Sequence, residues 1–172
     1  MRIVDGEPRH LESIRAIFNE AIVHTTALYE YQPRTVETVA AWYEAKRAAG
    51  LPLRVAEDDD GTLLGFATYG PFRAFPAYKY TVEHSVYVDV RQRGRGIGRC
   101  LLADLVGAAQ ARGCHCLVGV IDADNAGSIA LHEGLGFTCG GGLRQSGFKF
   151  GRWLDLVFYQ LLLPTPVEPV DG

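Results

Sequence analysis

The sequence lacks any hydrophobic run approaching the roughly 20 apolar residues that a membrane-spanning helix requires. It also lacks the apolar core of a secretory signal, because charged residues such as Asp5, Glu7 and Arg9 interrupt its first ten positions. Neither sign of charge dominates, since 17 Lys and Arg against 20 Asp and Glu leave a net charge of −3. We therefore expect a cytoplasmic protein with no general affinity for nucleic acid or for a membrane surface.

Cysteine is scarce, with four residues in a chain of 172. They occupy positions 100, 114, 116 and 139, within segments that have the apolar patterns of helices or strands. We therefore expect reduced, buried or half-buried thiols and no disulfide framework. Cys114-His115-Cys116 brings metal-ligating residue types together, yet no second ligand pair follows at zinc-finger spacing. The sequence therefore predicts no metal site.

The composition is that of an ordinary globular protein, with 48% apolar and 22% charged residues and no internal repeat. We expect a single domain over residues 1–163, followed by a proline-rich tail over 164–172. Apolar residues recur at helical spacing in four segments, 11–24, 36–49, 98–112 and 124–132. Strand patterns occupy 3–4, 53–57, 63–69, 81–90, 117–121 and the segments around 137 and 153–163.

This order of elements predicts an α+β fold of the α/β-sandwich kind. The sheet is expected to be mixed and mostly antiparallel, with six or seven strands and about four flanking helices. One parallel crossover is expected, because strand 81–90, the helix after it and strand 117–121 form a βαβ unit.

A glycine-rich turn connects the strand ending near Val90 to the helix that follows it. Gly94, Gly96 and Gly98 allow positive φ and close approach of a ligand, while the first N–H groups of the helix attract an anion. Arg99 stands where a dinucleotide fingerprint requires its third glycine, and the turn contains no lysine for a nucleotide-triphosphate loop. The pattern favours a diphosphate cradle; the alternative is a helix-capping turn with solvated arginines.

Two motifs carry a resemblance that spans nearly the whole chain. Arg93-x-x-Gly96-x-Gly98 resembles the Q/R-x-x-G-x-G/A pyrophosphate loop of the GCN5-related N-acetyltransferases (GNAT), a family that binds acetyl-CoA. Asn125-x-x-Ser128-x-x-x-His132-x-x-x-Gly136-Phe137 is similar to a second family element, which commonly has tyrosine at the position of His132. The resemblance implies a set of acetyl-CoA-binding residues: Val86, Tyr87, Val88, Gly94, Arg95, Gly96, Ile97, Gly98, Arg99, Asn125 and Ser128. For Asn125, a plain helix-capping role is the alternative.

Three further blocks, 81–88, 132–137 and 147–155, look like the phosphinothricin and methionine sulfoximine acetyltransferases within that family. This resemblance implies acetylation of the α-amino group of small amino-acid analogues, such as methionine sulfoximine, methionine sulfone or phosphinothricin. It also implies a homodimer. A protein or peptide N-acetyltransferase and a non-catalytic acyl-CoA sensor remain as alternatives, although retention of Glu83 argues against the sensor.

Acetyl transfer to an amine needs a base, an oxyanion donor and a proton for the leaving thiolate. Glu83 is the predicted base, with a surface carboxylate paired to an arginine as the alternative. We expect the backbone N–H of Val88 to stabilise the oxyanion. His132 is the predicted acid, and a structural histidine near the helix end is the alternative.

An amino-acid substrate also needs a partner for its carboxylate, and Arg73 is the predicted one, with a solvated arginine as the alternative. We expect Phe75, Tyr29 and Tyr78 to form walls of the side-chain pocket. Strand alternation turns His84 away from the face of Glu83, which suggests a structural role. The full set predicted to bind substrate is Arg73, Ala74, Phe75, Glu83, His84 and Ser85.

Overall fold

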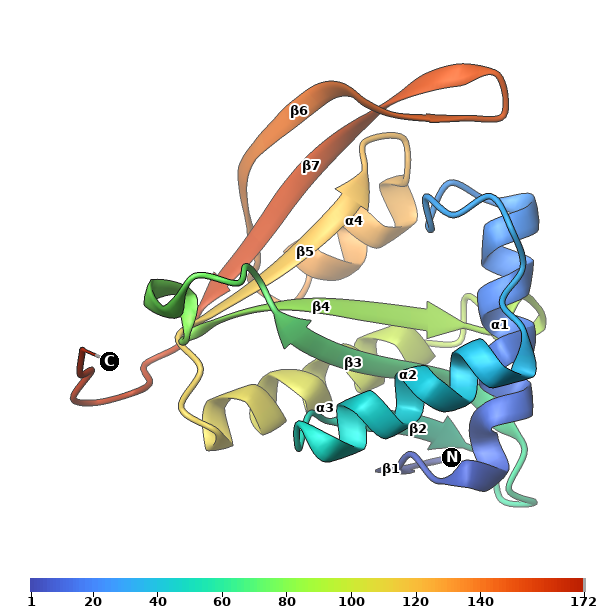
Figure 1. The fold of residues 1–172 in the computed structure, drawn as a ribbon, viewed down its shortest axis with the longest axis horizontal. Coiled ribbons are helices and arrows are strands. Elements are labelled where there is room, and N and C mark those ends of the chain that lie inside the picture. Colours follow the sequence, from blue (N-terminus) through green and yellow to red (C-terminus); the bar gives the residue numbers. More distant parts are fainter. Residues whose placement is uncertain (172) are drawn as a thin grey trace. The chain divides into compact units, whose positions relative to one another are not determined.

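The computed structural model describes residues 1–171, and Figure 1 labels its helices and strands. The helices are α1 (Leu11–His24), α2 (Val36–Ala48), α3 (Ile97–Ala111) and α4 (Ala126–Glu133). The strands are β1 (Arg2–Asp5), β2 (Leu53–Glu57), β3 (Leu63–Pro71), β4 (Thr81–Val88), β5 (Cys116–Asp122), β6 (Thr138–Lys149) and β7 (Arg152–Leu162). Short 3-10 helices cover Pro8–His10, Pro76–Tyr78 and Val90–Gln92.

The strands form one sheet in the order β1-β2-β3-β4-β5-β7-β6. β4 and β5 pair in parallel, whereas β1 with β2, β2 with β3, β5 with β7 and β6 with β7 pair antiparallel. The parallel pair is connected through α3, as a crossover requires. The predicted α+β fold, with its mixed sheet and four helices, is confirmed.

Residue contacts divide the chain into two compact units. Unit 1 contains Met1–Thr68 and Val86–Leu105, and unit 2 contains Tyr69–Ser85 and Val106–Gly172. The chain passes between the units within β3, within β4 and within α3.

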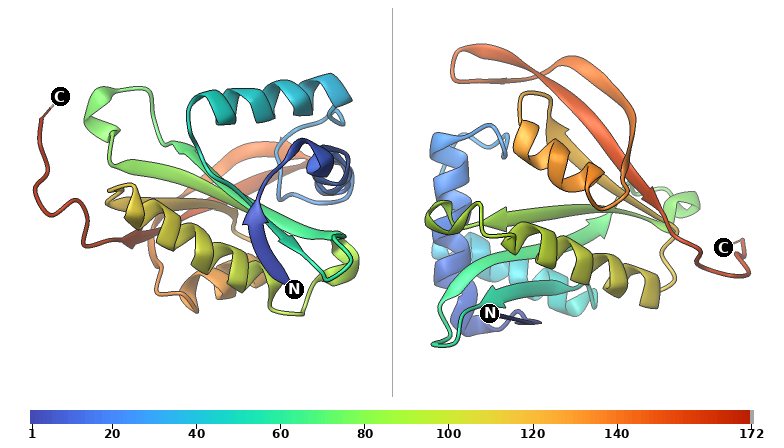
Figure 2. Two further views of the ribbon diagram at one scale, coloured as in Figure 1. Left: turned by 90° about the horizontal axis from the view of Figure 1, so that it is seen from below. Right: turned by 180° about the vertical axis from the view of Figure 1, so that it is seen from behind.

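Unit 1 has its core between helices α1 and α2 and one face of β2 and β3 (Figure 2). Thr35 begins α2 as expected, because its hydroxyl oxygen accepts a hydrogen bond from the N–H of Thr38 at 3.2 Å. Phe18 of α1 packs edge-on against Phe66 of β3, with ring centroids 4.9 Å apart. The buried core residues are Ile14, Ile17, Phe18, Val39, Leu53, Val55, Leu63 and Phe66.

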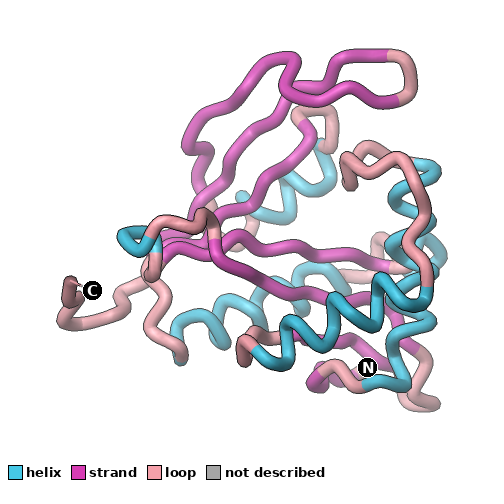
Figure 3. The backbone as a smooth tube through the Cα atoms, in the orientation of Figure 1, coloured by secondary structure: helices cyan, strands magenta, loops and turns pink. Residues whose placement is uncertain are grey.

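Unit 2 is built on the antiparallel ladder of β5, β7 and β6, whose long β6–β7 hairpin is seen in Figure 3. Buried Leu117 and Leu154 lie within this ladder, on β5 and β7. The segment 164–171 has no helix or strand, and residue 172 lies outside the described part. The tail is nevertheless bonded to unit 2, because the hydroxyl of Tyr80 contacts both backbone groups of Val170.

Two predictions about the strands were wrong: the end of one strand and the assignment of a glycine-rich link. β4 ends at Val88, because the side chain of Asp89 accepts the N–H of Arg91 and starts a 3-10 turn. The glycine-rich segment before β7 is strand β6, although its glycines disfavour extended structure. Pairing with β7 offsets that preference, and a Cβ on Gly142 would lie 2.7 Å from the carbonyl oxygen of Leu156.

The thiols are only partly as expected. Cys114 is buried and Cys116 half-buried, whereas Cys100 of α3 and Cys139 of β6 are exposed. Within residues 1–171, no three His, Cys, Asp or Glu side chains gather as metal ligands. No helix among the same residues has the length and apolarity to cross a membrane.

Candidate active site

The predicted diphosphate cradle lies in unit 1, between the end of β4 and the start of α3. Gly94 and Gly96 adopt positive φ of 76° and 79°, and among the described residues no atom beyond the adjacent residues lies within 4 Å of a Cβ placed on either one. Both positions therefore present open backbone, as a close-fitting anion requires. Gly98 does not share this conformation, contrary to expectation, because it already belongs to α3.

Helix α3 directs its first amides toward this cradle. The N–H of Cys100 donates to the carbonyl of Gly96 at 3.1 Å, so the amides of Ile97 and Gly98 precede the first intrahelical hydrogen bond. Ile97 is only 2% exposed and fixes the first turn to the core of unit 1. The helix N-terminus therefore provides N–H donors and a positive dipole end for an anion.

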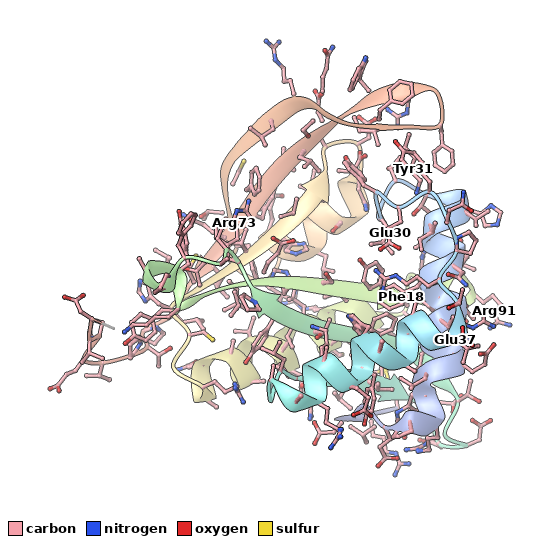
Figure 4. All side chains as sticks on the ribbon, in the orientation of Figure 1. Phe18, Glu30, Tyr31, Glu37, Arg73 and Arg91 are labelled. Atoms are coloured by element: carbon pink, nitrogen blue, oxygen red, sulfur yellow. The ribbon has the colours of Figure 1, made fainter. Side chains whose placement is uncertain are left out.

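The arginines of the cradle are exposed and hold local partners. Arg91 pairs with Asp89 at 2.6 Å, and Arg93 pairs with Glu20 at 3.2 Å. Arg95 donates to the side-chain oxygen of Gln92. Figure 4 labels Arg91 among the side chains of this region. Such exposed pairs exchange readily, because they contribute little free energy in water.

The strand segment Val86–Val88 is held by aromatic packing and by a close backbone approach. The ring of Tyr87 lies 5.2 Å from that of Phe18 and 5.3 Å from that of Phe66. A Cβ on Gly65 would lie 2.6 Å from the carbonyl oxygen of Tyr87, so no other residue fits at position 65 without displacing β4. This role of Gly65 was missed, although an isolated glycine in a strand indicates a close backbone approach.

The loop after α1 is also held in unit 1. Asn19 accepts the N–H of Arg34 at 2.7 Å and donates to its carbonyl at 3.0 Å, and the Arg34 guanidinium lies 3.8 Å from the centroid of Phe18. Arg34 also pairs with Glu30, and Figure 4 labels Phe18, Glu30 and Tyr31. Tyr29, a predicted wall of the substrate pocket, is half-buried in this loop.

In unit 2, Arg73 and Glu83 approach each other, so Glu83 has the arginine partner that the alternative interpretation of this residue expected. Nη1 of Arg73 lies 3.8 Å from Oε2 of Glu83, and 51% and 39% of the two side chains are exposed. Arg73, labelled in Figure 4, is anchored independently by Phe72. Its Nη1 donates to the Phe72 carbonyl at 2.7 Å, and its guanidinium lies 4.1 Å from the Phe72 ring centroid.

The environment of Glu83 combines two opposing effects. Burial raises the pKa of its carboxyl above the ordinary value, and the Arg73 guanidinium offsets part of that rise. A carboxylate with a raised pKa is better suited to accept a proton from an ammonium group near neutral pH.

The remaining loop residues of the predicted substrate set are open to solvent. Ala74 is exposed, and Phe75 is 73% exposed, so Phe75 forms no buried wall within unit 2. Tyr78 is 42% exposed and packs edge-on against Phe72, with ring centroids 5.6 Å apart. Ser85 is half-buried two residues after Glu83, on the same face of β4.

His84 does not join Arg73 and Glu83, and its inclusion among substrate-binding residues finds no support in its position. Its side chain is 4% exposed and stacks on His132 of α4, with ring centroids 5.1 Å apart. Gly119 of β5 leaves room for the pair, because a Cβ there would lie 2.8 Å from Nε2 of His132. The alternating strand pattern indicated the burial of His84, whereas only the structure shows its partner.

Both ring nitrogens of His132 have partners. Nδ1 lies 2.7 Å from the Ser128 carbonyl, which can only accept, so Nδ1 carries the proton. Burial lowers the pKa of His132, and a neutral ring then accepts at Nε2 from the Nε2–H of His84, 2.9 Å away. Burial, aided by the neighbouring His132, lowers the pKa of His84 to about 3, so the pair is neutral at pH 7.

Asn125 caps α4, because its Oδ1 accepts the N–H of Ser128 at 3.0 Å. The capping alternative is therefore correct for the side-chain oxygen. The amide nitrogen takes no part in the cap and remains a donor for a ligand. The Ser128 N–H is occupied by the cap, and its carbonyl is occupied by His132.

The fold and the glycine cradle together are typical of acetyltransferases. Residues 12–137 match the family model described as the Acetyltransferase (GNAT) family, and the chain belongs to this family.

Individual relatives are similar over nearly the full chain. The L-methionine sulfoximine/L-methionine sulfone acetyltransferase of Pseudomonas paraeruginosa is 46% identical over 168 residues, which are 97% of this chain and 98% of the relative. A phosphinothricin acetyltransferase from Sinorhizobium meliloti, solved in complex with acetyl-CoA, has a TM-score of 0.94 and 36% identity, with 99% and 94% of the two chains covered. A structure described as ribosomal-protein-alanine N-acetyltransferase from Brucella melitensis has a TM-score of 0.93 and 43% identity, with 95% and 100% covered.

Proposed function

We propose that this chain transfers the acetyl group of acetyl-CoA to the α-amino group of a small amino-acid analogue, such as methionine sulfoximine, methionine sulfone or phosphinothricin. The observation that carries this proposal is the placement of Arg73, in the loop after β3, 3.8 Å from Glu83 of β4. A zwitterionic amino acid presents a carboxylate for a guanidinium and an ammonium for a carboxylate. The name of the Pseudomonas relative supports the same substrate class.

The cradle fits the diphosphate of acetyl-CoA. Gly94 and Gly96 offer unobstructed backbone at positive φ, and the amides of Ile97 and Gly98 point outward from the N-terminus of α3. Arg95 and Arg99 supply cationic charge nearby. When bound, acetyl-CoA supplies the acetyl group as an activated thioester. The complex of the Sinorhizobium relative with acetyl-CoA supports this assignment.

Glu83 is assigned the proton from the substrate ammonium. An α-ammonium has a pKa of about 7.7–8.0, so a carboxylate with a raised pKa removes its proton at modest cost. In the balanced reaction, a new N–C bond replaces the C–S bond of the thioester. One ammonium proton goes to Glu83, and the second passes to the departing sulfur. We assign stabilisation of the carbonyl oxygen to the N–H of Val88, at the end of β4.

An acid role for His132 requires its contact with His84 to open and its Nε2 to gain a proton. In the neutral pair, the single N–H of His132 is bonded to Ser128 and none remains for the sulfur. A His132→Ala variant decides between the two roles. If His132 is the acid, the chemical step slows; if it is structural, stability falls while single-turnover rates stay close to wild type.

A peptide substrate is the second candidate, favoured by the name of the Brucella relative. Arg73 argues against it, because an N-terminal residue in a peptide has no free α-carboxylate to bind a guanidinium. Steady-state CoA release with methionine sulfone, methionine sulfoximine, phosphinothricin and a panel of peptides with an N-terminal alanine separates the candidates. A kcat/KM higher for the peptides would overturn the amino-acid assignment.

We also propose a homodimer. The β6–β7 hairpin exposes apolar side chains on both strands, with Phe148 47% and Trp153 59% exposed and their ring centroids 5.1 Å apart. Exposed apolar clusters of this kind are typical of protein interfaces. Light scattering coupled to gel filtration should give twice the chain mass. A Trp153→Glu variant should then elute at the mass of one chain.

We also propose a cytoplasmic location, and the free thiols are the evidence for it. Cys100 and Cys139 are exposed and free, which suits a reducing compartment. Fractionation of the native host should recover the chain with soluble cytoplasmic markers.

A further inference from the structure

We propose that Arg73 couples carboxylate recognition to the activation of the base: it pairs with Glu83 in the free protein and exchanges this partner for the carboxylate of the arriving substrate. Glu83 thereby becomes a stronger base only when an amino acid is bound. This inference rests on the proposed function and adds a specificity device to it, because an amine without a carboxylate leaves Glu83 paired.

The contact between Arg73 and Glu83 is of a kind that can be exchanged. At 3.8 Å it is longer than a charge-assisted hydrogen bond, whereas the pairs Arg47–Glu44 and Arg152–Asp124 are 2.7 and 2.8 Å long. The carboxylate of Glu83 therefore feels the charge of Arg73 without a direct hydrogen bond between them. A substrate carboxylate that accepts two N–H groups in the planar fork would displace this weaker partner.

Arg73 keeps its place when Glu83 is displaced. Phe72 holds the guanidinium through its carbonyl oxygen at 2.7 Å and through its ring at 4.1 Å from the centroid. These contacts use one face and one of the five N–H groups of the guanidinium. The Phe72 ring is in turn packed edge-on by Tyr78. Carboxylate recognition therefore needs no new anchor for Arg73.

Few other charges in unit 2 face Glu83. Its register partner on β5 is Val118, between Leu117 and Gly119, none of which is ionisable. β3 ends in Tyr69-Gly70-Pro71, and burial raises the pKa of Tyr69 to about 12, so this residue is neutral at pH 7. His84 follows on β4 but is buried on the opposite face and neutral. Arg73 is thus the cation that determines the charge state of Glu83 within this unit.

The electrostatic consequence follows from the two effects on Glu83. Burial raises its pKa and Arg73 lowers it, so neutralising Arg73 leaves the rise due to burial unopposed. A nearby substrate carboxylate adds in the same direction, because like charges disfavour the ionised form. We expect the pKa of Glu83 to rise by about one unit, which corresponds to a tenfold change in proton affinity.

The experiment measures the pKa of Glu83 directly by carbon NMR on protein labelled at the glutamate carboxyl, with the signal assigned by Glu83→Gln. Two fragments of methionine sulfone serve as probes: 4-(methylsulfonyl)butanoate, which lacks the amine, and 3-(methylsulfonyl)propylamine, which lacks the carboxylate. The butanoate should raise the pKa of Glu83 by about one unit, and the amine should not raise it. In ligand-free Arg73→Gln the pKa should already be raised, and the butanoate should add nothing.

Arg47→Gln is the matched control, because it removes an exposed ion-paired arginine on α2 and should leave the pKa of Glu83 unchanged. An unchanged pKa in ligand-free Arg73→Gln would overturn the proposal. So would saturation by the butanoate, followed through other resonances, without a rise in pKa. The titration needs no turnover, so failure of the proposed function, seen as absence of acetylation of any amine, is recorded separately.

Discussion

Nε2 of His84 lies 2.9 Å from Nε2 of His132, and the two rings stack at an interplanar angle of 27°. Two imidazoles in this contact need a single shared proton between them. The pair therefore connects β4 to α4 only while at least one ring nitrogen at the contact lacks a proton. Because the contact connects two elements of unit 2, its protonation bears on stability.

Acidification should destabilise the protein through this pair. The pKa of His84 is about 3 when folded and about 6.5 when unfolded, so the unfolded chain binds more protons between these values. The contribution of neutral His84 to the free energy of unfolding is therefore fully present above about pH 6.5. It falls as the pH decreases, with a slope approaching about 1.4 kcal/mol per pH unit. Urea unfolding at pH 5 to 8 measures this slope. His84→Asn should flatten it, whereas His24→Gln, at an exposed position, should not.

Gly119→Ala should destabilise the protein. The new Cβ would meet His132 at 2.8 Å and His84 at 3.1 Å, so the stacked pair has to shift, at a cost of about 1–3 kcal/mol. The control is Gly107→Ala in α3, where nothing lies within 4 Å and alanine should stabilise the helix by about 0.5–1 kcal/mol. Thermal unfolding of both variants gives the comparison. Equal stabilities would show that the two rings are not confined by β5.

Gly94→Ala and Gly96→Ala should weaken acetyl-CoA binding by at least about tenfold, because a side chain at positive φ is strained and covers the open backbone of the cradle. Gly113→Ala is the matched control, since Gly113 has a φ of 72° but follows the end of α3. All three variants should lose similar stability. Calorimetric titration with acetyl-CoA should show the loss of affinity only in the first two; the same loss in Gly113→Ala would assign the effect to strain.

Glu83→Gln should lower kcat by about 10²–10⁴-fold, the usual contribution of a general base, with acetyl-CoA affinity unchanged. The acidic limb of the kcat/KM profile should disappear with the carboxyl group, because that limb reports its protonation. Stopped-time assays of CoA release between pH 5.5 and 9 test both expectations. Near-normal turnover of Glu83→Gln at pH 7 would remove Glu83 from the mechanism.

Much of the fold could be predicted because the local preferences of these segments agree with the structure that they adopt in the packed protein. The helical spacing in 11–24 and the cap at Thr35 led to α1 and α2 with nearly correct ends. The glycine-rich segment 138–149 gave the wrong answer, because its strand exists only by pairing with β7. Local preference there favours turns, and the ladder supplies the free energy that reverses it.

The candidate site divides in the same way. Glycines 94 and 96, Arg73 and Glu83 could be named as candidates from residue type and order, because the chemistry of anions and zwitterions restricts which residues serve. The anchoring of Arg73 by Phe72 and the contact between His84 and His132, 48 residues apart, were not. No periodicity encodes which two side chains meet across separate elements.

By itself, then, the sequence determined the order of strands and helices, the cradle and the types of group available for acetyl transfer, since these depend on backbone preference and on side-chain chemistry. Only the tertiary structure decided the protonation state of the buried histidines and the distance between Arg73 and Glu83. Both depend on which atoms lie within a few ångströms of each other, and burial and Coulomb attraction act over that range.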